Sequence, residues 1–254
     1  MKSCWENLDL KGYAILKGLS TQEHSQALNF INDQWLEVIN HHNPGHPLLH
    51  DGNKLSILDY MKIESDLDHK SLWPKHRRIL PASFYDWIST TSLFTSLRSL
   101  FGSFLISDEE HIGYPNFMWR LVRPNVAEDI GPLHRDSWFW EANPSFSRDP
   151  EKKYLRVWVD INTQKSLNGL LLSPASHKRN DISWEIVRKD GYNKPIMLHL
   201  PNEFKLVMPN TDPGDMIVFD DSIIHGGSLN KGTSPRISFE FTIVTSGYEL
   251  KSLK

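Results

Sequence analysis

From residue 103 onward the chain consists of short apolar runs separated by turn residues, and this pattern constrains the fold more than any other feature. Runs of this kind, bounded by Gly, Pro, Asn and Asp, are typical of the short strands of sandwiches and barrels. A chain of 254 residues in which 39% are hydrophobic is long enough to bury a sizeable core in one unit. We expect strands at 116–123, 153–160, 168–173, 204–208, 215–219, 222–226 and 236–244.

The first 102 residues predict a helix-rich part instead, after a short opening strand in GYAIL. Ser20 and Glu23 form a capping-box pattern, in which the two side chains satisfy exposed amides at the start of a helix. A second helical region is expected at about 80–101. Short strands after a helical part predict a mainly β, α+β domain over 1–254, with helices packed on one face of a barrel or jelly roll at 103–250. Apolar residues recur near helical spacing in the first helix at Ala27, Leu28, Ile31, Trp35 and Ile39.

Composition and charge exclude several classes of function. The net charge of −3 offers no basic surface for nucleic acid. Cys4 is the only cysteine, so an intramolecular disulfide and thiolate metal clusters are excluded. The sequence contains neither a signal-peptide core nor an apolar run of about 18 residues, which is the length that spans a membrane. We therefore expect a cytoplasmic protein with no membrane or obligate protein partner.

Among 12 histidines, His134 alone is followed two residues later by a carboxylate, Asp136. In an extended segment residues i and i+2 point to the same side, so this pair can converge on one metal ion. A second histidine, usually from a distant strand, completes the facial sites that hold ferrous iron. His225 is the best candidate because it ends an expected hairpin in PGDMIVFDDSIIHGG. Taken alone, a histidine at a strand end is more often one that hydrogen-bonds to a carbonyl than a metal ligand.

The segment RISFEFTIV alternates apolar and polar residues over 236–244. If the apolar face packs on a hydrophobic layer, Arg236 and Ser238 point the opposite way, into a cavity. The planar fork of an arginine there suits a ligand carboxylate. Taken alone, the segment favours the alternative, which is a solvated arginine on an edge strand or an internal pair with a residue such as Glu240.

Taken together, these segments resemble the phytanoyl-CoA dioxygenase-like branch of the Fe(II)/2-oxoglutarate-dependent oxygenases. HRD is followed by His225 and then, 11 residues later, by an arginine. VWVDINTQKSLNGLLLSPASHKRN is similar to a strand–NG–strand–PGSH segment of that family, with Ala175 where glycine is usual. HGGSLNKGTSPR is similar to the segment that carries the distal histidine, although Gly227 replaces the serine or threonine of many relatives. The resemblance covers roughly residues 11–245.

The resemblance implies a double-stranded β-helix, a cupin-like fold, with iron held by His134, Asp136 and His225. It also implies that Arg236 binds the distal carboxylate of 2-oxoglutarate. Such a ligand set leaves three adjacent positions on Fe(II), two for the 2-oxo acid and one for O2. Further cosubstrate contacts are expected from Trp158 and from a hydroxyl that replaces the usual one, supplied by Ser228 or Ser238.

The implied reaction is hydroxylation of a small molecule, with release of succinate and CO2. Asp136 favours hydroxylation because related halogenases have Gly or Ala at that place. Alternatives are a cupin-like metalloenzyme that does not use 2-oxoglutarate, a non-catalytic jelly-roll binding module, and a hydroxylase of protein side chains. The histidines at 41, 42, 46 and 50 are expected in a solvated loop rather than a second metal site. Candidate substrate-pocket residues are Trp138, by alternation on the side of His134, with Trp140, Arg120 and Arg123.

Overall fold

A computed structural model describes residues 2–44, 55–143, 148–189 and 192–246. Two histidines of the expected solvated loop, at 46 and 50, lie outside these ranges. None of the described helices is both long and apolar enough to cross a membrane. The helices are α1 (Lys2–Lys11), α2 (Thr21–His42), α4 (His69–Leu72), α5 (Ala82–Ile88), α6 (Ser92–Phe101) and α7 (Asp136–Ala142), with short 3-10 turns between some of them.

The larger of the two facing sheets is antiparallel, with strand order β1-β8-β4-β10-β2, and β3 also pairs with β10. Its long central strands alternate side chains between two faces, both of them largely buried. Its strands are β1 (Tyr13–Lys17), β2 (Leu105–Ile106), β3 (Met118–Val122), β4 (Lys153–Asn162), β8 (Asp215–Asp220) and β10 (Arg236–Thr245).

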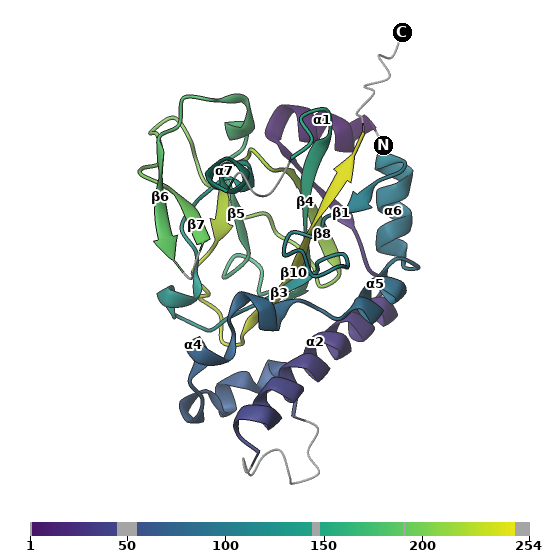
Figure 1. Ribbon diagram of the computed structural model, residues 1–254, viewed down its shortest axis with the longest axis vertical. Helices are drawn as coiled ribbons and strands as arrows, with labels where there is room; N and C mark the ends of the chain where they lie inside the picture. Colours follow the sequence, from purple (N-terminus) through teal and green to yellow (C-terminus); the bar gives the residue numbers. More distant parts are fainter. Residues whose placement is uncertain (1, 45–54, 144–147, 190–191, 247–254) are drawn as a thin grey trace.

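The smaller sheet pairs β5 (Leu170–Leu172) with β9 (His225–Gly227). Isolated bridges add one residue pair on each side, His134 with His225 and Leu172 with Val207. A separate hairpin, β6 (Trp184–Lys189) with β7 (Tyr192–Met197), lies beside α7 (Figure 1). The two sheets form the double-stranded β-helix.

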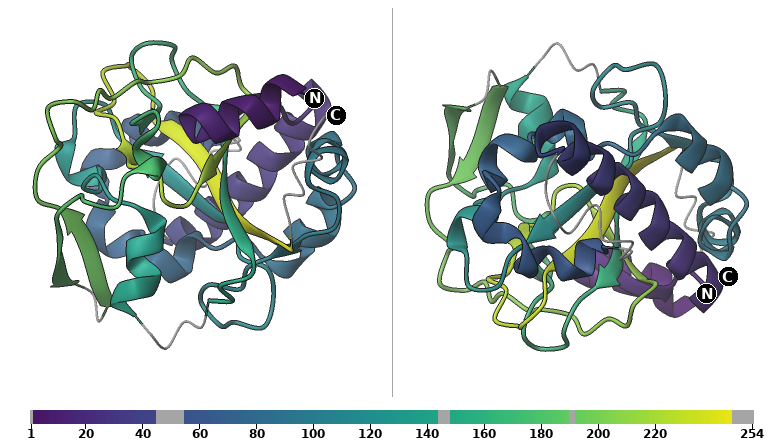
Figure 2. Two further views of the ribbon diagram at one scale, coloured as in Figure 1. Left: turned by 90° about the horizontal axis from the view of Figure 1, so that it is seen from above. Right: turned by 90° about the horizontal axis from the view of Figure 1, so that it is seen from below.

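The N-terminal helices cover the outer face of the larger sheet, with α2 crossing it diagonally (Figure 2). Buried side chains from α2, α5 and α6 pack in one cluster with the outward residues of β4, β8 and β10. Ring contacts such as Phe84 with Phe239, at 5.4 Å, join a helix directly to the sheet. Helices packed on one face, as the sequence predicts, are therefore confirmed.

The helix starting near residue 20 and most of the expected strands are confirmed. The capping box is present, since the Ser20 hydroxyl accepts from the Glu23 amide and Glu23 accepts from the Ser20 amide. The helical region at 80–101 is two helices, α5 and α6, because residues 89–91 form a turn. The expected strand at 204–208 is reduced to the single bridge at Val207, and the β6–β7 hairpin was not predicted.

The expected hairpin over 215–226 is wrong in one respect. β8 lies in the larger sheet and β9 in the smaller one, so the turn at Asp220 carries the chain from one sheet to the other. This corner brings His225 into the space between the sheets. It also places His225 opposite His134, which lies next to β9 in the smaller sheet.

Ala175, at the place where the family usually has glycine, adopts a left-handed conformation with φ of 64° and ψ of 2°. Its amide donates to the Lys11 carbonyl at 2.8 Å, which ties this turn to the end of α1. A Cβ in this region costs about 1–2 kcal/mol, which glycine avoids. The alanine therefore stores a small strain in a turn that leads away from β5.

Candidate metal centre

Three side chains converge between the sheets and form a site able to hold a metal ion. One ligand atom from each of His134, Asp136 and His225 lies within 4.8 Å of the other two. The two histidines are held by reciprocal backbone hydrogen bonds of 3.0 and 2.9 Å, and their ring centroids are 4.4 Å apart. The smaller sheet thus brings together the segments of His134 and His225, which the sequence could pair only through the family resemblance.

The backbone around the two histidines leaves one nitrogen of each ring available to a metal. Nδ1 of His134 lies 2.9 Å from the Pro132 carbonyl, and Nδ1 of His225 lies 3.1 Å from the Ile223 carbonyl. A carbonyl only accepts, so each Nδ1 carries the proton and each Nε2 keeps its lone pair. Both Nε2 atoms lie 3.6 Å from an oxygen of Asp136. Burial lowers the pKa of His225 to about 4, so this ring is neutral, as a ligand must be.

Asp136 is the first residue of α7, which differs from the extended segment expected for 134–138. The helix turns Trp138 away from the direction that alternation predicts. Its ring stacks on Trp184 of β6 with centroids 5.5 Å apart, and it is buried with Ile182 and Ile224. The structure therefore places Trp138 in a small core between α7 and the β6–β7 hairpin.

A buried guanidinium, that of Arg156 on β4, lies beside the candidate metal ligand Asp136. Its Nε is 3.7 Å from Asp136 Oδ2. Nη1 donates to Glu109 Oε1 at 2.5 Å and to Thr242 Oγ1 at 2.7 Å, and Nη2 donates to Glu240 Oε1 at 3.3 Å. Burial alone would raise the pKa of Asp136, but the positive charge of Arg156 outweighs this effect and lowers that pKa below its usual range. The carboxylate is therefore ionised and ready to bind a cation.

Sequence reasoning did not identify Arg156 and Glu109 as parts of the site. Arg156 sits in an apolar run that by itself predicts only a strand, although its alternation with Leu155 and Val157 places it on the inner face. Glu109 belongs to the loop after β2 and is 47 residues from Arg156 in the sequence. Alternation along the strand could therefore have indicated Arg156, whereas no pattern in the sequence pointed to Glu109.

Arg236 enters the same interior from β10 and is buried. Its Nη1 donates to the carbonyls of Gly169 at 2.5 Å and Ser228 at 3.4 Å, while its buried Nε has no hydrogen-bond partner in the described chain. No carboxylate of the described residues forms an ion pair with it, and Glu240 pairs with other arginines. Burial lowers the pKa of Arg236 to about 10, so the side chain stays charged at neutral pH.

The packing around Gly227 explains why a glycine stands where the family resemblance leads one to expect serine or threonine. A Cβ at that position would lie 2.9 Å from Arg236 Nη2 and 2.9 Å from Ile130 Cγ2. The guanidinium therefore occupies the space that a serine or threonine side chain would need. Ser228 and Ser238 are the residues from which the sequence predicts such a hydroxyl instead.

The two candidate serines differ in their contacts. Ser228 Oγ accepts from the Gly169 amide at 2.9 Å and donates to the Gly169 carbonyl at 3.1 Å, so its hydrogen-bonding capacity is used within the smaller sheet. Ser238 Oγ is buried on the inner face of β10 and has no partner among the described residues. Trp158 is buried on the inner face of β4, opposite Glu240.

The remaining substrate-pocket candidates are placed differently from one another. Arg120 pairs with Glu240 through Nε at 3.0 Å and Nη2 at 2.5 Å, and its side chain is 42% exposed. Arg123 donates three side-chain hydrogen bonds of 2.7–2.9 Å to Asp129 and Glu64. Trp140 is half-buried on α7, and its ring lies 6.2 Å from that of Tyr154.

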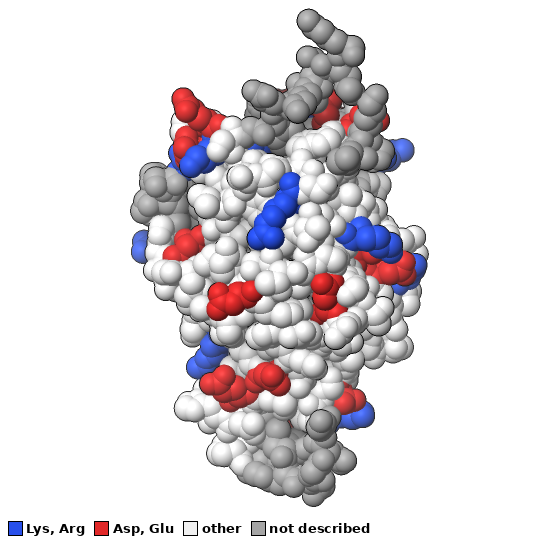
Figure 3. Space-filling view, turned by 90° about the vertical axis from the view of Figure 1, so that its right-hand side faces the viewer, with Lys and Arg blue, Asp and Glu red and all other residues white. Residues whose placement is uncertain are grey.

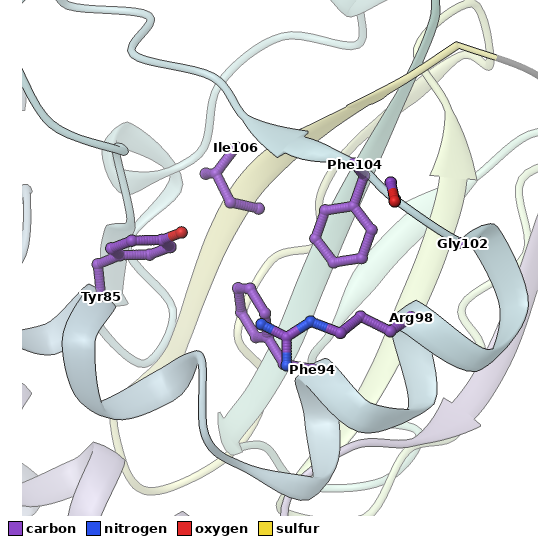
Figure 4. A pocket seen from close by; sticks show the side chains of 7 residues that line it. Tyr85, Phe94, Arg98, Gly102, Phe104 and Ile106 are labelled. Atoms are coloured by element: carbon purple, nitrogen blue, oxygen red, sulfur yellow. The ribbon is translucent and has the colours of Figure 1, made fainter.

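Elsewhere, the surface offers less chemistry. A hollow between α5, α6 and β2 is lined by Tyr85, Phe94, Arg98 and Phe104 (Figure 4). It lies on the outer side of the larger sheet, and the Arg98 guanidinium stacks over Phe94 at 5.4 Å. On the face shown in Figure 3, acidic and basic side chains lie singly or in small groups of either or both signs, without a basic patch.

Comparison with known proteins places the chain. The family model described as phytanoyl-CoA dioxygenase matches residues 66–238, which include the three converging side chains and Arg236. This protein belongs to the phytanoyl-CoA dioxygenase family. Family membership and the His-Asp-His site together make it an Fe(II)/2-oxoglutarate-dependent enzyme of the oxygenase type. A search of curated proteins finds no significant match.

Solved structures with the same fold are distant in sequence. The apo form of the non-heme monooxygenase ThoJ is 16% identical, with a TM-score of 0.60, over 94% of this chain and 76% of that one. EvdO2 from Micromonospora carbonacea var. aurantiaca, complexed with 2-oxoglutarate, is 15% identical with a TM-score of 0.59, over 99% and 93%. The epimerase SnoN, in complex with Fe3+, alpha ketoglutarate and nogalamycin RO, is 15% identical with a TM-score of 0.57, over 96% and 83%. These likenesses establish the fold.

Proposed function

We propose that this protein uses Fe(II), 2-oxoglutarate and O2 to hydroxylate a small molecule, with release of succinate and CO2. His134, Asp136 and His225 hold the iron, and Arg236 holds the distal carboxylate of 2-oxoglutarate. When bound, the iron supplies the activation of O2 that no side chain provides. The solved structures of this fold include an epimerase as well as a monooxygenase, so the hydroxylation itself rests on the features of this chain.

The observation that carries the proposal is a buried cation that forms no direct ion pair with a carboxylate of the described residues. Arg236 is 5% exposed, remains charged, and faces only carbonyl oxygens among the described residues. Burial of an uncompensated guanidinium is costly, and a ligand carboxylate that accepts its hydrogen bonds removes this cost. A dicarboxylic 2-oxo acid would meet both needs of the site, because one end could bind the metal and the other could pair with Arg236.

Ser238 and Trp158 complete the proposed cosubstrate subsite. The Ser238 hydroxyl lies two residues from Arg236 on the same face of β10 and lacks a partner in the described chain, so a second hydrogen bond to the distal carboxylate would satisfy it. Trp158 packs in an apolar cluster with Leu170 and Ile217 and would shield this side of the proposed subsite from water. Ser228 serves instead to hold β5 to β9.

Side-chain exposure supports a direction for substrate entry. His134 is 30% exposed and Arg120 is 42% exposed, whereas His225 is 7% exposed. The substrate therefore approaches between β3 and the segment of His134. Arg120 is the proposed substrate contact, because Arg123 is less exposed and already pairs with two carboxylates, and Trp138 is packed in the core. The presence of the carboxylate of Asp136, which related halogenases lack, favours hydroxylation over halogenation.

A metalloenzyme that does not use 2-oxoglutarate is the second candidate, and Arg236→Ala separates the two. Loss of a charged hydrogen-bonding group typically costs about 1.5–3 kcal/mol, so the apparent affinity for 2-oxoglutarate should fall about 10- to 150-fold. The measurement is the rate of succinate formation at varied 2-oxoglutarate. Arg188→Ala, at an exposed position of β6, is the matched control and should leave the affinity unchanged. An unchanged affinity in Arg236→Ala would favour the second candidate.

A further inference from the structure

One guanidinium serves three carboxylates beside the metal site. Arg156 contacts Glu109, Glu240 and Asp136, and the side chains of Arg156, Glu109 and Glu240 are each only 11% exposed. Its Nη atoms serve Glu109 and Glu240, and only its Nε faces Asp136. Glu240 has a second cation in Arg120, whereas the remaining contact of Glu109 in this cluster is the Thr242 hydroxyl. Arg156 is therefore the principal neutralising group of Glu109.

An iron site held by two histidines and one carboxylate keeps three positions open only if no second carboxylate binds the metal. Ferrous iron accepts carboxylate oxygens readily, and buried carboxylates without a cation gain strongly from a divalent ion nearby. Each further carboxylate that joined the iron would occupy a position needed for 2-oxoglutarate or O2. In the part of the chain that the structure describes, the group of close ligand atoms consists of His134, Asp136 and His225, without Glu109 or Glu240.

We propose that Arg156 is a positioning residue that keeps Glu109 and Glu240 out of the metal's coordination sphere. The inference rests on the proposed function, because it concerns the positions that 2-oxoglutarate would fill. The guanidinium suits this role since its fork of five N–H donors binds several carboxylates at once and cannot lose its charge. A lysine has one compact charge and would not hold the two glutamates and face Asp136 together.

The test uses Arg156→Met in the full chain, with Co(II) as the metal and 2-oxoglutarate as the second ligand. Calorimetry gives the two affinities, and the visible spectrum of Co(II) reports changes in its ligands. In the variant, Glu109 loses its cation and joins the metal. Co(II) affinity should then be equal or higher, while 2-oxoglutarate affinity falls by about tenfold or more, as is typical for changes next to metal ligands.

A second substitution distinguishes this role from a general structural one. Arg156→Met/Glu109→Gln removes the intruding carboxylate and should restore 2-oxoglutarate binding to within a few-fold of wild type. Arg156→Met/Glu110→Gln is the matched control, because Glu110 pairs with Lys75 rather than with Arg156, and it should not restore binding. If Arg156→Met does not fold, Arg156→Lys is measured instead, and a smaller fall in 2-oxoglutarate affinity with Co(II) binding intact is expected.

Three results would overturn the inference. The first is an unchanged 2-oxoglutarate affinity in Arg156→Met or, where that variant does not fold, in Arg156→Lys. The second is loss of Co(II) binding together with 2-oxoglutarate binding. The third is failure of Glu109→Gln to restore 2-oxoglutarate binding. The proposed function is tested separately, by wild-type protein. Wild type that binds no 2-oxoglutarate contradicts the proposed function, whereas wild type and Arg156→Met that bind it equally contradict only the role of Arg156.

Discussion

The two faces of β10 are both buried, yet they are built from opposite chemistry. Ile237, Phe239 and Phe241 face the helices and are at most 1% exposed. Arg236 and Ser238 face the smaller sheet and are 5% and 0% exposed. Burial of the first set is favourable by itself, while burial of the second set costs free energy unless each polar group finds a partner. The alternation therefore separates a core from a site, rather than a core from a surface.

The largest effect is expected from breaking the apolar face. Phe239→Ala removes a fully buried ring that contacts Phe84, Phe117 and Phe241. Truncations of this kind cost about 3–5 kcal/mol because a cavity remains. Denaturant unfolding of the apo protein measures the loss. A loss below about 1 kcal/mol would mean that this layer does not carry the stability assigned to it.

The neighbouring residue on the inner face should behave in the opposite way. Ser238→Ala removes a buried hydroxyl that has no partner in the described chain, so stability should stay level or rise slightly. Affinity for 2-oxoglutarate should fall by about five- to tenfold, the loss of one hydrogen bond of about 1 kcal/mol or slightly more. Equilibrium unfolding and a 2-oxoglutarate titration of the same variant give both numbers. If stability dropped and the affinity held, Ser238 would belong to the core.

The smallest effect is expected at the turn of Ala175, which belongs to neither face of β10. Ala175→Gly removes the strain of a left-handed alanine, which raises the free energy of unfolding by about 1–2 kcal/mol. The glycine also increases the entropy of the unfolded chain, which lowers the free energy of unfolding by about 0.4–1 kcal/mol. The net gain in unfolding free energy should be about 0.5–1 kcal/mol, with no change in 2-oxoglutarate affinity. The melting temperature measures this gain, and a value that did not rise would show that the backbone of the alanine turn is already relaxed.

Strands with strict alternation were predictable from the sequence. Alternation also placed Arg236 on the face opposite the apolar one, but it did not decide between an inner position and a solvated edge. Alternation of apolar and polar residues defines β10 without knowledge of its partners. The three metal-site residues needed the family resemblance, because spacing alone did not decide whether His225 meets His134. The structure supplies that contact through the reciprocal hydrogen bonds of the smaller sheet.

Other features depend on contacts that no local pattern encodes. The helix that starts at Asp136 follows a residue with extended backbone, and its register determines that Trp138 meets Trp184 of the β6–β7 hairpin. The partner of Arg156 in the loop after β2, Glu109, is set by how that loop closes over the interior. Such long-range polar pairs leave no periodic trace in the sequence, which is why they appear only in the folded chain.

The most direct measurement of the central claim is an anaerobic titration of the apo protein with Fe(II) and 2-oxoglutarate. A 2-oxo acid that chelates ferrous iron gives a weak visible charge-transfer band. We expect this band in wild type at one equivalent of iron per chain, and its loss in His134→Ala. Absence of the band in wild type, or an undiminished band in His134→Ala, would contradict the assignment of the metal centre.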